Sequence, residues 1–143
     1  MKQYNPTTPS RRQMTTPIYR GVLSAVEPYK NLTSKICQRP GRNNQGRITT
    51  RHQSGGHKKL YRLIDFNQNK LNVPARVETI EYDPYRTAFI ALILYKDGER
   101  SYILASKNMK VGDEIIVAEN APLKEGNRLA LKNIPKFRSI LIK

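Results

Sequence analysis

Residues 88–105 read AFIALILYKDGERSYILA, and this stretch decides the fold. Its first eight residues are apolar without a break, which is the pattern of a strand that is buried on both faces. The segment 96–99, KDGE, then supplies the Asp-Gly pair of a tight hairpin turn, and residues 101–105 return as the partner strand. The sequence therefore predicts an antiparallel hairpin at the centre of the domain.

Further short strands, separated by turn signals, lie on either side of this hairpin. Residues 76–82 alternate in apolar character and stop at an Asp-Pro turn signal. After the hairpin, VGD at 111–113 leads into a strand at 114–118, and EGN leads into a strand at 128–134. Five or six short strands with no long helical period predict an all-β domain, and a small five-stranded barrel of the oligonucleotide-binding (OB) type fits this number.

Charge divides the chain into two unlike parts. Residues 1–62 carry 13 Lys or Arg and one acid, Glu27, whereas residues 63–143 carry 13 Lys or Arg and 10 acids. The net charges are therefore +12 and +3. The first part has the composition of an arm that becomes ordered when a polyanion binds it. We therefore predict a long, basic, extended N-terminal arm at 1–59, followed by the barrel at 60–143.

The central part of the arm and its junction with the barrel, residues 39–66, read RPGRNNQGRITTRHQSGGHKKLYRLIDF. This segment holds nine Arg, Lys or His side chains and four glycines but one acid. Cations interleaved with amides, hydroxyls and glycines, which allow close backbone approach, are suited to a phosphate backbone. The predicted partner is RNA. The candidate RNA-binding residues are Arg11, Arg12, Arg39, Arg42, Asn43, Asn44, Arg47, Thr49, Arg51, His52, His57, Lys58, Lys59, Tyr61, Arg62 and Arg86.

Several of these side chains have a second interpretation. The cations of the arm also fit a solvated charged face, and His52 and His57 are of a metal-ligating type, although no third ligand lies nearby. Tyrosines 61, 82 and 85 beside arginines have the interleaving of a base-stacking platform, and equally that of a barrel rim. Glu81 and Asp83 are expected to be solvated acids on the outer face, because no nucleophile accompanies them.

Composition argues against other classes of protein. The single Cys37 excludes an internal disulfide, and one Cys with two His gives no recognisable metal-ligand spacing. The longest apolar run, 88–95, is far below the roughly 20 residues that span a bilayer. We therefore predict no enzyme, cofactor, metal or membrane contact. The basic, acid-free first 20 residues resemble a targeting peptide, but their prolines favour an extended tail laid along RNA.

Three long strings carry a family resemblance: GRNNQGRITTRH at 41–52, SGGHKKLYRLIDF at 54–66 and VETIEYDPYRTAFIALILYKDGERSYILA at 77–105. They resemble the universal large-subunit ribosomal protein two family in its bacterial form. The resemblance implies an extension threaded into large-subunit ribosomal RNA, an OB-type barrel from about Tyr61, neighbouring ribosomal proteins as partners, and a structural role in translation. A free single-stranded RNA-binding OB module is the alternative, which sedimentation with the large subunit would distinguish.

The chain departs from the family pattern in three places. Ser54 and Pro40 stand where the family usually has glycine, and because neither removes a cation we expect local adjustment only. The family also continues beyond its NIP motif, 133–135 here, into an SH3-like barrel, whereas this chain ends with KFRSILIK. We therefore expect a separate polypeptide that carries the SH3-like half and contacts the apolar residues of segment 137–142.

The resemblance also implies a compartment. The strings NPTTPSRR at 5–12 and TAFIALI at 87–93 are most similar to alphaproteobacterial versions of the family. A protein divided between two genes is more plausible in an organelle than in a bacterium. The expected location is therefore the large subunit of the mitochondrial ribosome, with the plastid as the alternative.

Overall fold

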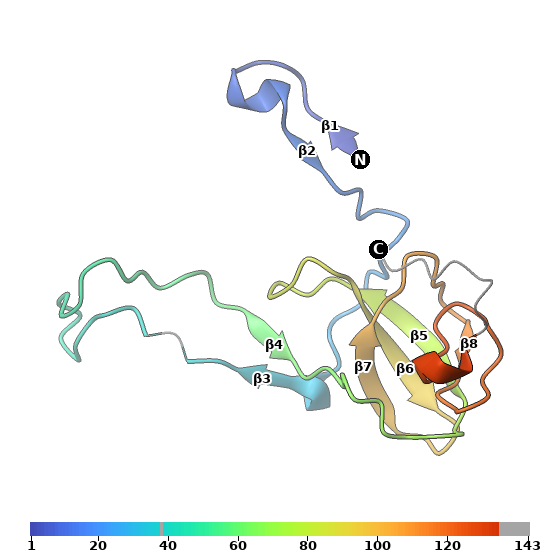
Figure 1. The fold of residues 1–143 in the computed structure, drawn as a ribbon. Helices are drawn as coiled ribbons and strands as arrows, with labels where there is room; N and C mark the ends of the chain where they lie inside the picture. Colours follow the sequence, from blue (N-terminus) through green and yellow to red (C-terminus); the bar gives the residue numbers. More distant parts are fainter. Residues whose placement is uncertain (38, 135–143) are drawn as a thin grey trace.

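The computed structural model describes residues 1–37 and 39–134, and these residues form an all-β fold, as predicted (Figure 1). Segment 137–142, the expected contact surface of a second polypeptide, lies outside the described residues. The strands are β1 (Lys2–Gln3), β2 (Thr15–Thr16), β3 (Thr33–Lys35), β4 (Leu60–Arg62), β5 (Ala75–Glu81), β6 (Ile90–Tyr95), β7 (Arg100–Leu104) and β8 (Glu114–Ile115). The 3₁₀ turns are η1 (Ser10–Arg12), η2 (Lys30–Leu32) and η3 (Leu131–Asn133).

The predicted hairpin is confirmed as β6 and β7, which pair antiparallel from Ile90 opposite Leu104 to Leu94 opposite Arg100. Gly98 adopts a positive φ of 89° in the turn between them, a conformation that glycine reaches without strain. The carboxylate of Asp97 accepts a hydrogen bond from the backbone N–H of Glu99 at 3.1 Å, which tightens the turn. Local turn chemistry therefore sets the register of the central strand pair.

The main sheet has four strands in the order β7-β6-β5-β8, all antiparallel, and it is visibly curled (Figure 1). A bulge lies at Glu78, because Val77 pairs with Ile93 while Thr79 pairs with Leu92. Bulges bend a strand and increase its twist, which contributes to the curl. Isolated bridges between Ile64 and Tyr102 and between Val117 and Arg128 extend the sheet at its edges. This curled all-β arrangement is consistent with an OB-type domain.

One predicted strand, 128–134, is not formed as expected. The backbone of Arg128 bridges Val117, but the chain then enters the 3₁₀ turn η3. Leu131 is 75% exposed, so its side chain does not hold the segment against a sheet face. The amide of Asn133 instead donates to the carbonyl of Glu119 at 2.7 Å.

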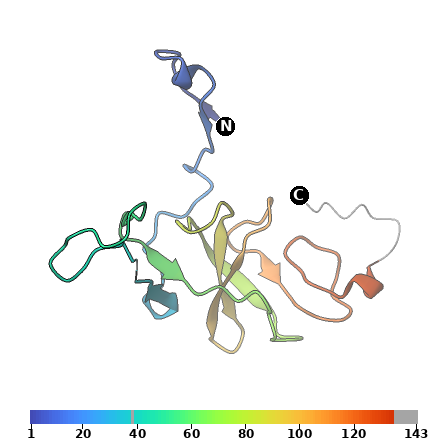
Figure 2. The same cartoon turned by 60° about the vertical axis from the view of Figure 1, so that its left-hand side comes forward.

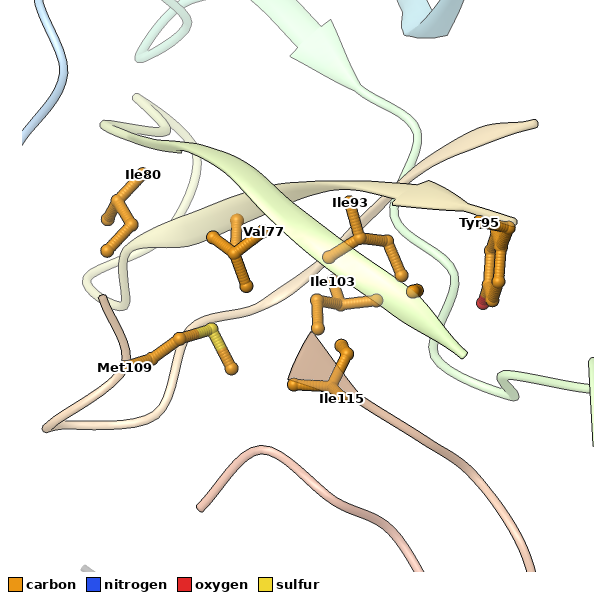
Figure 3. Packing of buried hydrophobic residues seen from close by; sticks show 9 residues of the cluster. Val77, Ile80, Ile93, Tyr95, Ile103, Met109 and Ile115 are labelled. Carbon is orange, nitrogen blue, oxygen red and sulfur yellow. The ribbon is translucent and has the colours of Figure 1, made fainter. Parts of the chain in front are cut away.

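The core lies on both faces of β6. Its odd-numbered residues enter a large cluster that includes side chains of β5, β7 and β8 (Figure 3). Its even-numbered residues Ile90 and Leu92 join Tyr102 in a second cluster, which Tyr29, Leu32 and Ile64 cover. The apolar run predicted to be buried on both faces is confirmed, because each face has its own covering layer. The buried residues of the large cluster are Ala75, Val77, Ile80, Ala91, Ile93, Tyr95, Ile103, Met109 and Ile115.

The arm reaches away from the main sheet and contains short strand pairs that the sequence does not predict (Figure 1). Strands β1 and β2 form a small hairpin that projects from the barrel, and β3 and β4 form a second ribbon with a long loop (Figures 1 and 2). Between them the chain touches the barrel, where Ser24 exchanges two hydrogen bonds with the backbone of Ile80, one through its side chain. The division at 59/60 stays a prediction, and the β3–β4 pair crosses it.

Candidate nucleic-acid interface

The strand pair β3–β4 positions most of the predicted RNA-binding residues. Thr33 lies opposite Arg62 and Lys35 opposite Leu60, and beyond this last pair the chain leaves the ribbon as the loop 36–59 (Figure 1). The loop extends away from the main sheet. Thirteen of the sixteen predicted residues lie on this loop or on β4. They are Arg39, Arg42, Asn43, Asn44, Arg47, Thr49, Arg51, His52, His57, Lys58 and Lys59 in the loop, and Tyr61 and Arg62 on β4.

The outer part of the loop, residues 41–50, is closed by its own hydrogen bonds, and we call it the loop head. The carbonyl of Gly41 accepts the backbone N–H groups of Thr49 at 2.8 Å and Thr50 at 3.1 Å, and the Thr49 hydroxyl at 3.0 Å. Gly41 has a φ of +65°, and a Cβ atom there would lie 2.5 Å from the Thr50 carbonyl oxygen. Only glycine fits this position without a shift of the backbone.

Asn43 organises the interior of the loop head. Its side-chain oxygen accepts the backbone N–H groups of Gln45 at 3.0 Å and Arg47 at 2.9 Å. The Arg42 guanidinium donates to the carbonyl of Gly46 at 2.8 Å, and the backbone of Arg42 bridges that of Ile48. Arg42, Asn43 and Thr49 thus hold the loop in shape, and a direct contact of these three with RNA stays a prediction.

Other cations of the loop have no partner among the described residues. The side chains of Arg39, Arg47, Arg51 and Lys58 are exposed, and within residues 1–37 and 39–134 they form no hydrogen bond or ion pair. His52 has a positive φ of 61°, and Nδ1 of His57 lies 3.0 Å from the carbonyl oxygen of Lys58. Four cations that no acid among the described residues neutralises give this loop a positive potential, which favours anions.

A second group of predicted residues lies at the base of the loop. The rings of Tyr61 and Tyr85 meet edge to face with centroids 5.4 Å apart. The Arg86 guanidinium lies 5.8 Å from the Tyr61 ring centre, and the Lys59 ammonium lies 5.8 Å from that of Tyr85. We call Lys59, Tyr61, Tyr85 and Arg86 the aromatic cluster. The structure therefore brings together cations and aromatic rings from β4 and from the turn after β5.

The cations of the aromatic cluster and its neighbourhood differ in how far they are already paired. Arg86 Nε lies 2.6 Å from Oδ2 of the fully buried Asp83, in contact but without the angles of a hydrogen bond. Arg62 donates to the carbonyl of Leu60 at 2.8 Å, while its Nε is buried without a partner. Lys59 is exposed and contacts no acid in the described part of the chain. Lys59 is therefore the cation of this group most open to an external anion.

Arg11 and Arg12 lie apart from these groups, on η1 in the β1–β2 hairpin. Arg11 lies 5.9 Å from the Tyr4 ring centre and donates to the Thr7 hydroxyl at 3.4 Å. Figure 2 shows this hairpin standing away from both the barrel and the loop. The structure therefore does not join these two residues to the other candidates in one surface.

The prediction that Glu81 and Asp83 are solvated outer-face acids is wrong. Glu81 is 4% exposed and Asp83 is fully buried. Glu81 accepts hydrogen bonds from the Tyr102 hydroxyl at 2.8 Å and the Thr79 hydroxyl at 2.9 Å, and Asp83 accepts the backbone N–H of Tyr85 at 2.9 Å. Thr79 lies on the same strand as Glu81, but Tyr102 reaches Glu81 from β7 and the donor to Asp83 is turn backbone. A strand-face pattern does not reveal these last two contacts.

Burial changes the chemistry of Tyr102. Its hydroxyl accepts the backbone N–H of Tyr29 at 2.9 Å while donating to Glu81. Removal from water disfavours the charged phenolate, and this burial raises the pKa of Tyr102 well above its ordinary value. The neutral hydroxyl therefore joins the arm to β5 and β7 across the normal pH range.

The candidate RNA-binding residues include neither Asp83, Tyr85 nor Phe66, although the interleaving of tyrosines with arginines pointed to Tyr85. Phe66 is 57% exposed, and its ring centre lies 5.7 Å from the Arg86 guanidinium. The Asp83-Pro84 turn signal in the sequence could have indicated Tyr85, because Asp83 of that turn accepts the backbone N–H of Tyr85 and so fixes its position.

In the part of the chain that the structure describes, no group of three or more His, Cys, Asp or Glu side chains is arranged to hold a metal ion. No helix among those residues is long and apolar enough to cross a membrane.

Comparison with known proteins identifies the family of this chain. Residues 29–117 match the family model described as "Ribosomal Proteins L2, RNA binding N-terminal domain". The chain is 55% identical over 130 residues to "Large ribosomal subunit protein uL2" of Buchnera aphidicola subsp. Schizaphis graminum, covering 91% of this chain and 47% of that protein. It is 53% identical over 135 residues to the protein of the same name from Hyphomonas neptunium, covering 94% and 49%. The chain spans about half the length of these relatives. The family match includes β3, the loop, the aromatic cluster and the four strands of the main sheet, and on this ground the chain belongs to the ribosomal protein L2 family.

Proposed function

We propose that this chain binds large-subunit ribosomal RNA as a structural, non-catalytic component of the large ribosomal subunit. The observation that carries the proposal is the loop head, which its own hydrogen bonds hold in one shape while the adjacent cations stay unpaired. A loop fixed before binding loses less conformational entropy when RNA arrives. The similarity to two large-subunit ribosomal proteins supports the same function.

The proposed binding energy is largely electrostatic. Arg39, Arg47, Arg51 and Lys58 lie along the loop with no acid beside them. Each phosphate that such a cation neutralises releases condensed counterions, so affinity falls as salt rises. If six to ten cations contact phosphates, raising the salt from 50 to 200 mM should lower the affinity for RNA by about 10³- to 10⁵-fold.

The test replaces Arg47, Arg51 and Lys58 together by alanine and measures the salt dependence of binding to large-subunit ribosomal RNA. The slope of log affinity against log salt should decrease by about one unit for each lost phosphate contact. The matched control replaces Lys96, Lys107 and Lys124, three exposed lysines of the barrel, and should change the slope less. Equal slopes for the unsubstituted chain and the loop variant would show that the loop does not bind phosphates.

The proposal also names the partners of the chain and its compartment. We propose neighbouring ribosomal proteins as partners, a separate polypeptide with the SH3-like half, and a mitochondrial ribosome with the plastid as the alternative. The support is the similarity of strings in the sequence, and both matched relatives are bacterial. Mass spectrometry of large subunits purified from mitochondria tests these points together. Detection of a full-length version of the chain, or of no second-half polypeptide, would contradict the divided protein.

A further inference from the structure

The aromatic cluster ends in one open ring. Tyr61 is half-buried, with Tyr85 at its edge and Arg86 over its face. Tyr85 is 36% exposed, and the cation nearest its ring is Lys59. The cluster therefore presents to solvent an aromatic ring beside a mobile ammonium group, while its inner members are packed.

The turn beneath Tyr85 is unusually well fixed. The fully buried Asp83 accepts the backbone N–H of Tyr85 at 2.9 Å and holds the Arg86 guanidinium through its other oxygen. Arg86 in turn lies between the rings of Tyr61 and Phe66, at 5.8 and 5.7 Å from their centres. Because the charge of Arg86 is compensated and its side chain is 18% exposed, it orders the turn and offers little to an incoming phosphate.

The exposed end of the cluster fits one nucleotide. An exposed aromatic ring stacks a base of any type, provided that the base is not already stacked in a duplex. Lysine is a flexible point charge, so Lys59 can move from the ring of Tyr85 to a phosphate without disturbing the turn. A double helix offers no free base face, so this surface suits single-stranded RNA rather than a duplex.

We propose that Tyr85 and Lys59 bind one unpaired nucleotide of RNA, whose base stacks on the Tyr85 ring while its phosphate pairs with Lys59. Arg86 is a positioning residue that acts through Tyr61 and the turn. This inference rests on the proposed RNA-binding function and adds a single-strand site on the barrel to the phosphate contacts of the loop. It also removes Arg86 from the set of direct RNA contacts.

The chain contains no tryptophan, so the fluorescence of a single introduced indole reports on its own site alone. The full-length Tyr85→Trp variant has one indole fluorophore, and its emission should be quenched when single-stranded hexa-adenylate is added. A fully paired RNA duplex at the same phosphate concentration should quench it much less. The matched control is Tyr82→Trp, since Tyr82 is 49% exposed and packs edge to face on Tyr19 with no cation over its ring in the described part of the chain. Its emission should change little with either RNA.

Affinity for hexa-adenylate supplies a second measurement. Tyr85→Ala should weaken binding by about 5- to 150-fold, the range expected for the loss of one stacked base. Tyr85→Phe should restore most of it, because the ring rather than the hydroxyl is used. Lys59→Ala should weaken binding and lower the salt slope by about one unit. Circular dichroism of each variant should match that of the unsubstituted chain.

The outcomes separate this inference from the proposed function. Equal quenching of Tyr85→Trp and Tyr82→Trp, or no loss of hexa-adenylate affinity in Tyr85→Ala, overturns the nucleotide site. If either occurs while the chain still binds large-subunit ribosomal RNA, the proposed function stands without the site. If the chain fails to bind that RNA but the selective quenching persists, the proposed function fails and the single-strand site stands.

Discussion

The hydroxyl of Tyr102 donates a hydrogen bond to the carboxylate of Glu81 at 2.8 Å, and both side chains are buried. The same hydroxyl accepts the backbone N–H of Tyr29, so one atom joins β7, β5 and the segment that leads into β3. A buried carboxylate is costly unless hydrogen bonds stabilise it. The Tyr102 hydroxyl is therefore one of the points, with Ser24 at Ile80, where the arm is tied to the barrel.

Replacement of Tyr102 by phenylalanine should destabilise the fold by about 1–3 kcal/mol, because the Glu81 carboxylate and the Tyr29 N–H both lose a partner in the interior. Urea unfolding measures the change. The matched control is Tyr95→Phe, since the Tyr95 hydroxyl is buried without a hydrogen-bond partner among the described residues. That control should be neutral or stabilising. A larger loss of stability in Tyr95→Phe than in Tyr102→Phe would contradict the assigned role of the Tyr102 hydroxyl.

Stability should fall at alkaline pH for a specific reason. Burial raises the pKa of both Tyr102 and Tyr95 above the ordinary value of 10.0. Their contribution to stability is therefore complete below about pH 10 and is lost as the pH rises from the unfolded value toward the folded one. The slope of unfolding free energy against pH above 10 should be reduced in each Tyr→Phe variant and most reduced in the double variant. An unchanged slope in the double variant would exclude these tyrosines as its cause.

Gly41→Ala should impair RNA binding without unfolding the barrel. The new Cβ would lie 2.5 Å from the Thr50 carbonyl at a φ of +65°, so the loop head must open. We expect about a tenfold loss of affinity for large-subunit ribosomal RNA, equivalent to roughly 1.4 kcal/mol. Gly46→Ala is the matched control, because its φ of +77° is similar but nothing lies within 4 Å of the added atom. Comparable losses in the two variants would indicate that backbone strain, rather than the shape of the loop head, is responsible.

Arg86→Gln should cost roughly 3–5 kcal/mol of stability, because it leaves the Asp83 carboxylate buried without its cation. The double variant Asp83→Asn with Arg86→Gln removes both charges and should recover much of that loss. In this double variant the salt slope of RNA binding should equal that of the unsubstituted chain. A slope lower by about one unit would mean that Arg86 is itself a phosphate contact.

The sequence predicts what local chemistry controls. The β6–β7 hairpin is predictable because an unbroken apolar run and an Asp-Gly turn lie within 18 residues, 88–105. The charge of the loop is likewise visible in composition. The burial of Glu81 is not predictable in this way, because Thr79 lies close to it in sequence but Tyr102 reaches it from another strand. A pattern along one strand cannot show which partner a fold brings across to it.

The same limit applies to the arm. Its net charge predicts an extended segment, but not that β1 pairs with β2, that β3 pairs with β4 across the 59/60 division, or that a stretch between them touches the barrel. Ser24 pairs with the backbone of Ile80 across 56 residues of sequence, and no composition rule detects that contact. Conversely, 3₁₀ turn η3 replaces a predicted strand because the apolar Leu131 finds no sheet face to cover.

The burial of β6 on both faces determines which N-terminal truncations keep its apolar side chains covered. Residues 29–32 form part of the lid over Ile90 and Leu92, although they belong to the arm by composition. A truncated chain that starts at residue 60 would keep the four strands of the main sheet and lose that lid. Its bare aliphatic side chains would favour self-association over solubility. The segment that contains Tyr29 and Leu32 thus shields apolar side chains of the barrel from water, and we expect a fragment that stays monomeric to begin before Tyr29.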